Sequence, residues 1–220
     1  MKHDSSGFTL IEMAIVLVVI GLLLGATIKG QELINSSKLK RLLRDFHNIP
    51  VSIEGYQDKF RAFPGDDAGL AMHLTGATPC SPQGVAGKCM VGNGMIDGGW
   101  SDSTIASESY VMWQHLRLAG LETGSTDTSN LNGDYIPRNI VGGKIGVTSS
   151  SPIIGLSGTY IICSDNILGK FAKQLDDELD DGNTATGYIR VVDAGTTVPA
   201  NPYQTININD NDLYLVCMGV

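Results

Sequence analysis

The chain has 220 residues, of which 42% are apolar, and its 23 acidic and 15 basic residues give a formal net charge of −8. A nucleic-acid surface needs a basic stripe that displaces counterions, so this acidic composition excludes that class. The length allows one substantial core with one further segment outside it. The apolar residues crowd into the first thirty positions, and the rest is rich in Gly, Ser, Thr, Asn and Asp.

The first predicted element is an apolar helix that contains one acid. The segment from Phe8 to Ile28 has about twenty residues, the length that crosses roughly 30 Å of hydrocarbon as a helix. Glu12 lies near its start. A carboxylate at the centre of such a helix costs about 2.5–3.5 kcal/mol, less near the interface, and is usually retained for a partner. A secretory signal is shorter and has no acid in its apolar region, and an ordinary signal anchor has no use for Glu12.

The stretch Gly7-Phe8-Thr9-Leu10-Ile11-Glu12 resembles the processing site of type IV prepilins and of the related pseudopilins. The resemblance implies that a dedicated peptidase cuts between Gly7 and Phe8 on the cytoplasmic face and methylates the new amino terminus at Phe8. It also implies that Glu12 neutralises the Phe8 amine of the neighbouring subunit in a fibre. A short charged leader before the motif and a membrane-length run after it favour this interpretation over an ordinary single-span anchor.

The charges that flank the span favour an orientation opposite to the one that the resemblance implies. The leader carries Lys2 against Asp4, whereas basic residues follow the span at Lys29, Lys38, Lys40, Arg41 and Arg44. The positive-inside rule alone would place the long C-terminal part in the cytoplasm. We follow the resemblance, which implies a single-pass inner-membrane protein with a periplasmic head that later joins an extracellular or periplasmic filament.

Past the span, the helix is expected to continue to about Arg61. Apolar residues recur there at i, i+3 and i+4 spacing. They are Leu39, Leu42, Leu43, Phe46, Ile49, Ile53, Tyr56 and Phe60. Pro50 lies inside the pattern and is expected to kink the helix, and Pro64-Gly65 ends it. A long N-terminal spine of this kind is what the resemblance implies.

The expected organisation is a cleaved leader at 1–7, a membrane-spanning part at 8–28, an amphipathic continuation at 29–62 and a globular α+β head at 63–220. Helices are predicted in Gly65–Leu74 with Asp66 or Asp67 as the N-cap, in Ser107–Leu121 with Gly120 as the stop, and in Asn166–Leu179. Strands are predicted at Lys144–Thr148, Thr159–Cys163, Tyr188–Asp193 and Asp212–Cys217. The resemblance implies that the head is an antiparallel β-sheet packed on the C-terminal half of the spine.

The four cysteines allow three pairings. No C-x-x-C spacing is present, which disfavours a zinc site, and an export route favours disulfides. Local closure gives Cys80–Cys89 and leaves Cys163–Cys217. Pilins of the family often tie a late strand to the C-terminal segment in this way, whereas type II secretion pseudopilins usually do not. The alternative is four free thiols in a cytosolic head.

Candidate chemistry is sparse. The histidines are scattered, with His115 expected to be partly buried, and no phosphate-loop, nucleophile-elbow or zinc-protease motif is present, so we expect no active site and no enzyme. An acidic cluster contains Asp176, Asp177, Glu178, Asp180 and Asp181. A solvated acidic face is the favoured interpretation, with a calcium site or a contact to a basic patch of the next subunit as alternatives. A second loop with Asn93 and Asp97 is a weaker calcium candidate. No other cofactor is expected.

The sequence thus predicts a structural subunit of a type IV pilus-like filament, a minor pilin in preference to a major one because of the long Gly-rich loops and the second cysteine pair. The expected partners are other pilin subunits through the N-terminal helix, the prepilin peptidase and the inner-membrane assembly machinery. One alternative is a type II secretion pseudopilin. Another, from a different class, is a membrane-anchored periplasmic binding module that never polymerises.

Overall fold

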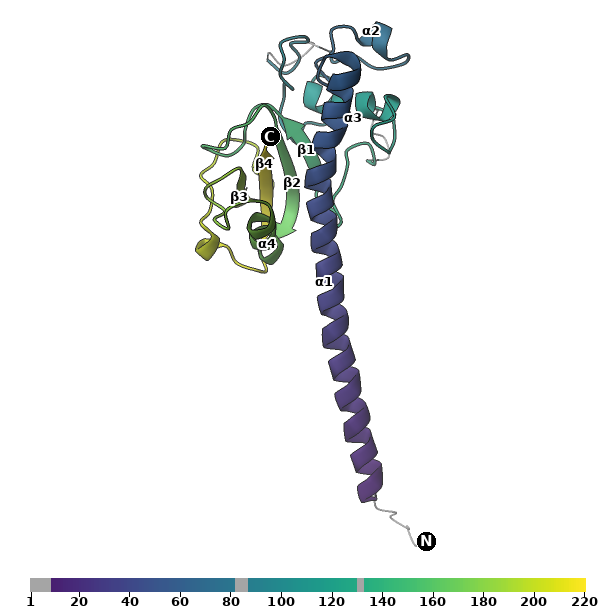
Figure 1. Cartoon of the computed structure of the whole chain (residues 1–220), viewed down its shortest axis with the longest axis vertical. Coiled ribbons are helices and arrows are strands. Elements are labelled where there is room, and N and C mark those ends of the chain that lie inside the picture. Colours follow the sequence, from purple (N-terminus) through teal and green to yellow (C-terminus); the bar gives the residue numbers. More distant parts are fainter. Residues whose placement is uncertain (1–8, 82–86, 130–132) are drawn as a thin grey trace, which may run out of the picture. The chain divides into compact units, whose positions relative to one another are not determined.

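The computed structural model describes residues 9–81, 87–129 and 133–220. Its elements in chain order are α1 (Leu10–Phe60), α2 (Leu70–His73), α3 (Glu108–Leu118), β1 (Ile145–Thr148), β2 (Ile161–Leu168), α4 (Gly169–Leu179), β3 (Ile189–Asp193), the 3-10 helix η1 (Thr205–Asn207) and β4 (Leu213–Gly219) (Figure 1). The chain divides into two compact units between Lys40 and Arg41. A long N-terminal helix followed by an antiparallel sheet confirms the predicted α+β class.

The N-terminal unit is the apolar part of α1. An 18-residue window of this helix reaches a mean hydropathy of 2.6, and none of the window is buried within the protein. Large apolar side chains from Leu10 to Ile34 are exposed. By length and composition, the segment can therefore cross a membrane as one helix.

The C-terminal unit begins with the amphipathic part of α1. Five residues of the predicted stripe are buried, and they follow alternating steps of four and three residues. They are Leu42, Phe46, Ile49, Ile53 and Tyr56. Steps of this size keep side chains on one face of an α-helix, whereas Val51 and Glu54 on the other face are exposed. The helix continues through this amphipathic part to Phe60 and includes Pro50 without a break.

The sheet has the order β1-β2-β4-β3, and every neighbouring pair is antiparallel (Figure 1). β2 is longer than predicted, because Ile167 and Leu168 still pair with Tyr214 and Leu213 of β4 after an irregularity that follows Ser164. A β-bulge of this kind inserts residues without ending the strand. Helix α4 consequently starts at Gly169, three residues later than the sequence pattern predicted.

Two disulfide bonds join Cys80 to Cys89 and Cys163 to Cys217. Cys163 and Cys217 lie directly opposite each other on β2 and β4, so this bond links the two central strands. It is part of a buried cluster with Trp100, Ile153 and Leu215. The Cys80–Cys89 bond links two residues that are nine positions apart in the chain.

We predict that thiol labelling without reductant finds no free cysteine, and that peptide mapping recovers Cys80–Cys89 and Cys163–Cys217 as the only pairs. Replacing Cys163 and Cys217 together by alanine should lower the free energy of unfolding of the head by about 2–4 kcal/mol. Chemical denaturation measures this change. Labelling of all four cysteines in protein taken from cells would contradict the pairing and would indicate a head that faces the cytoplasm.

Helix α3 is buried on nearly all sides from Glu108 to Leu116. Its end is the one the sequence predicted, since Gly120 adopts a φ of 77° and Leu121 donates its amide to the carbonyl of Leu116 over 2.9 Å. This is the Schellman arrangement, in which a left-handed glycine lets the chain leave the helix. The prediction for His115 was wrong, because its side chain is fully buried and not partly exposed.

Candidate functional site

The start of α1 carries the residues that the sequence singled out. Gly7 and Phe8 lie outside the described residues, and Thr9 directly precedes the helix. The Thr9 amide and hydroxyl both donate to Oε2 of Glu12, over 2.7 and 2.8 Å, and the Glu12 amide donates to the Thr9 hydroxyl over 3.3 Å. These reciprocal bonds form a capping box, which satisfies amides that the first helical turn leaves free.

The capping box gives Glu12 a local role that sequence reasoning missed, although T-x-x-E before an apolar run is its known signal. Glu12 remains exposed within the chain, and none of the ion pairs among the described residues involves it. The carboxylate is therefore oriented by Thr9 but is not neutralised by a described basic side chain. An acid held in this way is open to an external cation.

Asp66 and Asp67 do not cap α2, so that prediction was wrong. The helix begins at Leu70 after Gly69, without a side-chain cap. Asp66 is buried and accepts backbone amides from the 92–94 loop, including the amide of Gly94 over 2.7 Å. A buried carboxylate needs such donors, and three amides from a glycine-rich turn supply them.

Asp67 instead connects α1 to the segment around α2. Its Oδ2 accepts the hydroxyl of Tyr56 over 2.9 Å, and its Oδ1 accepts the amide of Gly69 over 2.8 Å. The same carboxylate lies 2.8 Å from Nδ1 of His73. Asp67 thus holds the end of α1 to the chain that follows it, which is a structural role.

Glu108, at the first position of α3, is fully buried and accepts the amides of Met90 and Asp97 over 2.8 and 2.9 Å. Burial raises the pKa of Glu108 to about 7, and the two amide donors oppose that rise. Cys80 and Cys89 lie near this carboxylate, but their disulfide leaves no thiolate for a metal. The group therefore fixes the 90–97 loop to α3.

His115 is buried, and its hydrogen bonds are those of a neutral imidazole ring. Its Nδ1 accepts the amide of Gly65 over 3.0 Å, which leaves Nε2 to donate to the carbonyl of Thr78, also over 3.0 Å. Burial lowers the pKa of His115. Both ring nitrogens are used by the backbone, so this histidine connects two loops and has no free nitrogen for catalysis or for a metal.

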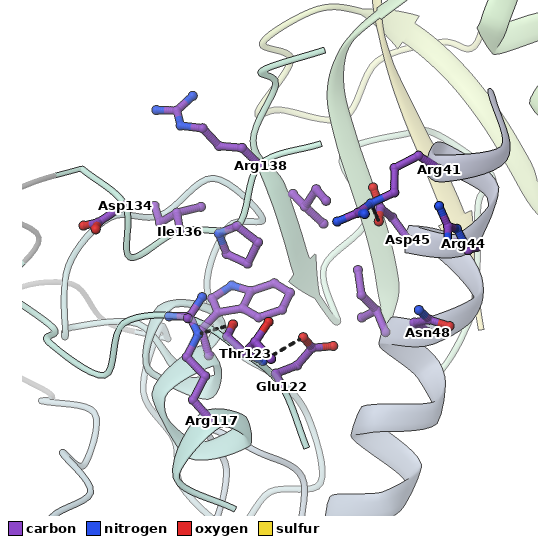
Figure 2. A pocket seen from close by; sticks show the side chains of 15 residues that line it. Arg41, Arg44, Asp45, Asn48, Arg117, Glu122, Thr123, Asp134, Ile136 and Arg138 are labelled. Carbon is purple, nitrogen blue, oxygen red and sulfur yellow. Dashed lines mark hydrogen bonds and ion pairs between the residues drawn. The ribbon is translucent and has the colours of Figure 1, made fainter. Parts of the chain in front are cut away.

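A cavity of about 530 Å³ lies in the C-terminal unit, between α1 and the segments around α3 and β1 (Figure 2). Arg41, Arg44 and Asp45 face it from α1, and Arg117 and Glu122 face it from the end of α3 (Figure 2). Much of this charge is already paired. Arg41 lies 3.7 Å from Asp45, and Arg117 donates to the carbonyls of Thr123 and Ser125.

The lining of this cavity also includes the apolar residues Trp113, Ile136 and Ile145. Among the described residues that line it, we find no pair of a nucleophile and a base within hydrogen-bond distance. Charged and apolar side chains also occur together at surfaces that contact another polypeptide.

The calcium candidates of the sequence divide into two places. The Asn93 side-chain amide donates to Oδ2 of Asp97 over 2.8 Å, and Oδ1 of Asn93 accepts the amide of Met95. Because Asn93 directs its NH₂ group and not its oxygen toward Asp97, this pair is an internal contact of the loop. At the other place, Asp176, Asp180 and Asp181 come together at the end of α4, whereas Asp177 is exposed and outside that group.

The favoured interpretation of the second cluster as a solvated face was wrong for Asp176, which has no exposed surface. Asp176 follows Phe171, Ala172 and Leu175 on the buried side of α4. Burial raises the pKa of Asp176 to about 7, the neighbouring carboxylates add to the rise, and the amide of Gly182 opposes it.

Comparison with known proteins assigns the N-terminal segment. Among the described residues, one apolar helix is long enough to span a membrane, and its place before an α+β head fits a membrane-anchored protein. The family model described as Prokaryotic N-terminal methylation motif matches residues 2–28, so this segment is similar to the processing segment of type IV pilins and pseudopilins, and the long apolar helix fits it. No curated protein and no solved structure matches the chain.

Proposed function

We propose that this chain is a structural subunit of a type IV pilus-like filament, processed at Gly7–Phe8 and assembled from the inner membrane through its N-terminal helix. The observation that carries the proposal is the methylation motif over residues 2–28, with Glu12 inside an otherwise apolar membrane-length helix. In this account the head is periplasmic before assembly, and the partners are other pilin subunits, the prepilin peptidase and the assembly machinery.

The physical basis for assembly is charge pairing together with helix packing. A membrane and a bundle of apolar helices are similarly apolar, so moving α1 from one to the other yields little hydrophobic free energy. Packing of the helices and pairing of Glu12 with the Phe8 amine of a neighbour then make the filament more favourable for α1 than the membrane. The exposed apolar side chains from Leu10 to Ile34 are the surface that such a bundle would cover.

Within the family, we favour a minor pilin. The support is the composition of the head, which has two disulfides and long Gly-rich loops suited to a specialised surface. A type II secretion pseudopilin is the second candidate, because the methylation motif is shared by both groups. The candidate from another class is a membrane-anchored binding module that never polymerises, and the position of Glu12 argues against it.

Fractionation tests the proposal. Filaments sheared from cells that carry wild-type major subunits should contain the protein without its first seven residues, and the membrane fraction should hold the remaining pool. Immunoblotting of the two fractions measures the ratio. Recovery in the membrane fraction alone, in cells that assemble filaments, would contradict a filament role and would favour the non-polymerising module.

A further inference from the structure

The end of α4 gathers negative charge around a buried acid. Asp176, Asp180 and Asp181 each present a carboxylate oxygen, and these atoms lie within 4.8 Å of one another. Asp176 has no exposed surface, and neither of its carboxylate oxygens accepts a hydrogen bond of normal geometry from a described residue, the nearby amide of Gly182 included. An ionised carboxylate buried in this way is strongly unfavourable unless a cation or hydrogen-bond donors compensate it.

The other two acids are held in place by the chain around them. Oδ2 of Asp180 accepts the amide of Ile189 over 2.8 Å, at the first residue of β3. Asp181 accepts the amide of Asn183 and the hydroxyl of Thr186, over 2.8 and 2.7 Å. These neutral donors fix the carboxylates without removing their charge, and carboxylate oxygens keep further lone pairs for a ligand.

No described basic side chain forms an ion pair with the group, although the charge of Arg190 contributes to a lowered pKa of Asp181. The ion pairs among the described residues do not include these three acids. The nearby Arg190 directs its guanidinium to the carbonyls of Ile154 and Gly187. In addition, the cluster lies at the C-terminal end of α4, where the helix dipole is negative and a cation is favoured.

We propose that Asp176, Asp180 and Asp181 form a binding site for a hard divalent cation, and that the cation is Ca²⁺. Ca²⁺ accepts oxygen ligands in flexible geometry at about 2.3–2.6 Å, and it completes its shell with backbone carbonyls and water. Mg²⁺ requires a tighter octahedron and keeps most of its water, which suits the fully buried Asp176 less well.

The site differs from the helix–loop–helix calcium loop. The ligands are spaced i, i+4 and i+5 from the last turn of a helix, and Leu179 takes the place where that loop needs an oxygen. Because Asp180 is also bonded to the first residue of β3, the cation would tie the end of α4 to the start of that strand. The proposal concerns the head alone and does not depend on filament assembly.

Calcium titration of the full-length protein in detergent micelles tests the site. After EDTA treatment at mildly alkaline pH, isothermal calorimetry with Ca²⁺ should give one site per chain. Thermal unfolding of the head should shift upward by about 5–10 °C when Ca²⁺ exceeds its dissociation constant about a hundredfold. Mg²⁺ at the same concentration should give a smaller shift, and an equal shift would overturn the choice of Ca²⁺.

Two single substitutions separate a site from general charge screening. Asp176→Asn keeps the shape of the side chain but removes its charge, so it should abolish the Ca²⁺ shift and raise the midpoint in EDTA. Asp177→Asn, on the exposed side of the same turn, should keep the full response. Equal loss in both variants, or no calorimetric binding by the wild-type protein, would overturn the proposal and leave Asp176 as a protonated buried acid.

Discussion

Glu12→Ala is expected to be inserted into the membrane and cleaved normally, but to be missing from sheared filaments. In the proposed filament, the substitution leaves the Phe8 amine of a neighbour in an apolar bundle without a counter-charge, and an unpaired buried charge costs about 3–5 kcal/mol. Because 1.4 kcal/mol corresponds to a factor of ten, recovery in filaments relative to the membrane should fall by at least about tenfold. Immunoblotting of the two fractions measures it.

The capping box requires a control, because Glu12→Ala also removes the bonds from Thr9. Loss of an N-terminal cap costs about 0.5–2 kcal/mol. Glu12→Gln keeps a side chain that can serve in a capping box while it removes the charge. Thr9→Ala does the reverse, since it removes the hydroxyl contacts and keeps the acid.

The two variants separate the roles of Glu12. Pairing with an external amine predicts that Glu12→Gln assembles poorly, although less poorly than Glu12→Ala, and that Thr9→Ala assembles almost as the wild type does. If Glu12→Gln instead reaches filaments at the wild-type ratio while Glu12→Ala does not, the acid serves as a helix cap. Normal recovery of Glu12→Ala would show that assembly does not need Glu12.

Gly7→Val is expected to block removal of the leader. The family peptidase is expected to need an unbranched residue beside the cut, and valine places two carbon atoms on Cβ. The precursor should accumulate in the membrane, with cleavage at least about tenfold below wild type, and the variant should then be missing from filaments. Mass spectrometry of the membrane fraction measures the ratio of precursor to mature chain.

Ser6→Val is the matched control for this prediction. It adds the same branched side chain one residue further from the cut, so its leader should be removed normally. Normal cleavage of Gly7→Val would contradict the assignment of the processing site. Failure of both variants would show that the leader as a whole, and not Gly7, has been disturbed.

The sequence was most informative where a periodic pattern repeats over many residues. The apolar stripe of α1 predicted its buried face from Leu42 to Tyr56, and β-branched runs predicted four strands whose limits shifted by only a few residues. Gly120 marked the end of α3 because only a left-handed residue allows that exit from a helix. Patterns of this kind depend on local geometry, which the sequence carries directly.

Long-range polar contacts could not be predicted in the same way. Asp66 looked like a helix cap, but its partners are amides of a loop more than twenty residues later, and no local pattern connects them. The full burial of His115 could not be predicted for the same reason. The amide and the carbonyl that bond its ring belong to Gly65 and Thr78, in two separate loops.

Two features had a local signal that went unused. The T-x-x-E spacing of Thr9 and Glu12 predicts a capping box, and the structure contains it. Ala172 lies four residues before Asp176 on the buried side of α4, so helical spacing places Asp176 on that side as well. In both cases, the carboxylate was interpreted through a partner outside its own helix, although its neighbours in that helix determine its position.

The N-terminal mass of the mature protein tests the central claim most directly. Filament or membrane protein from wild-type cells is digested, and the N-terminal peptide is measured by mass spectrometry. A type IV pilin-like subunit should begin at Phe8 and carry one additional methyl group on its amine. A mature chain that still contains Met1–Gly7, or that begins at Phe8 without the methyl group, would contradict processing by a prepilin peptidase.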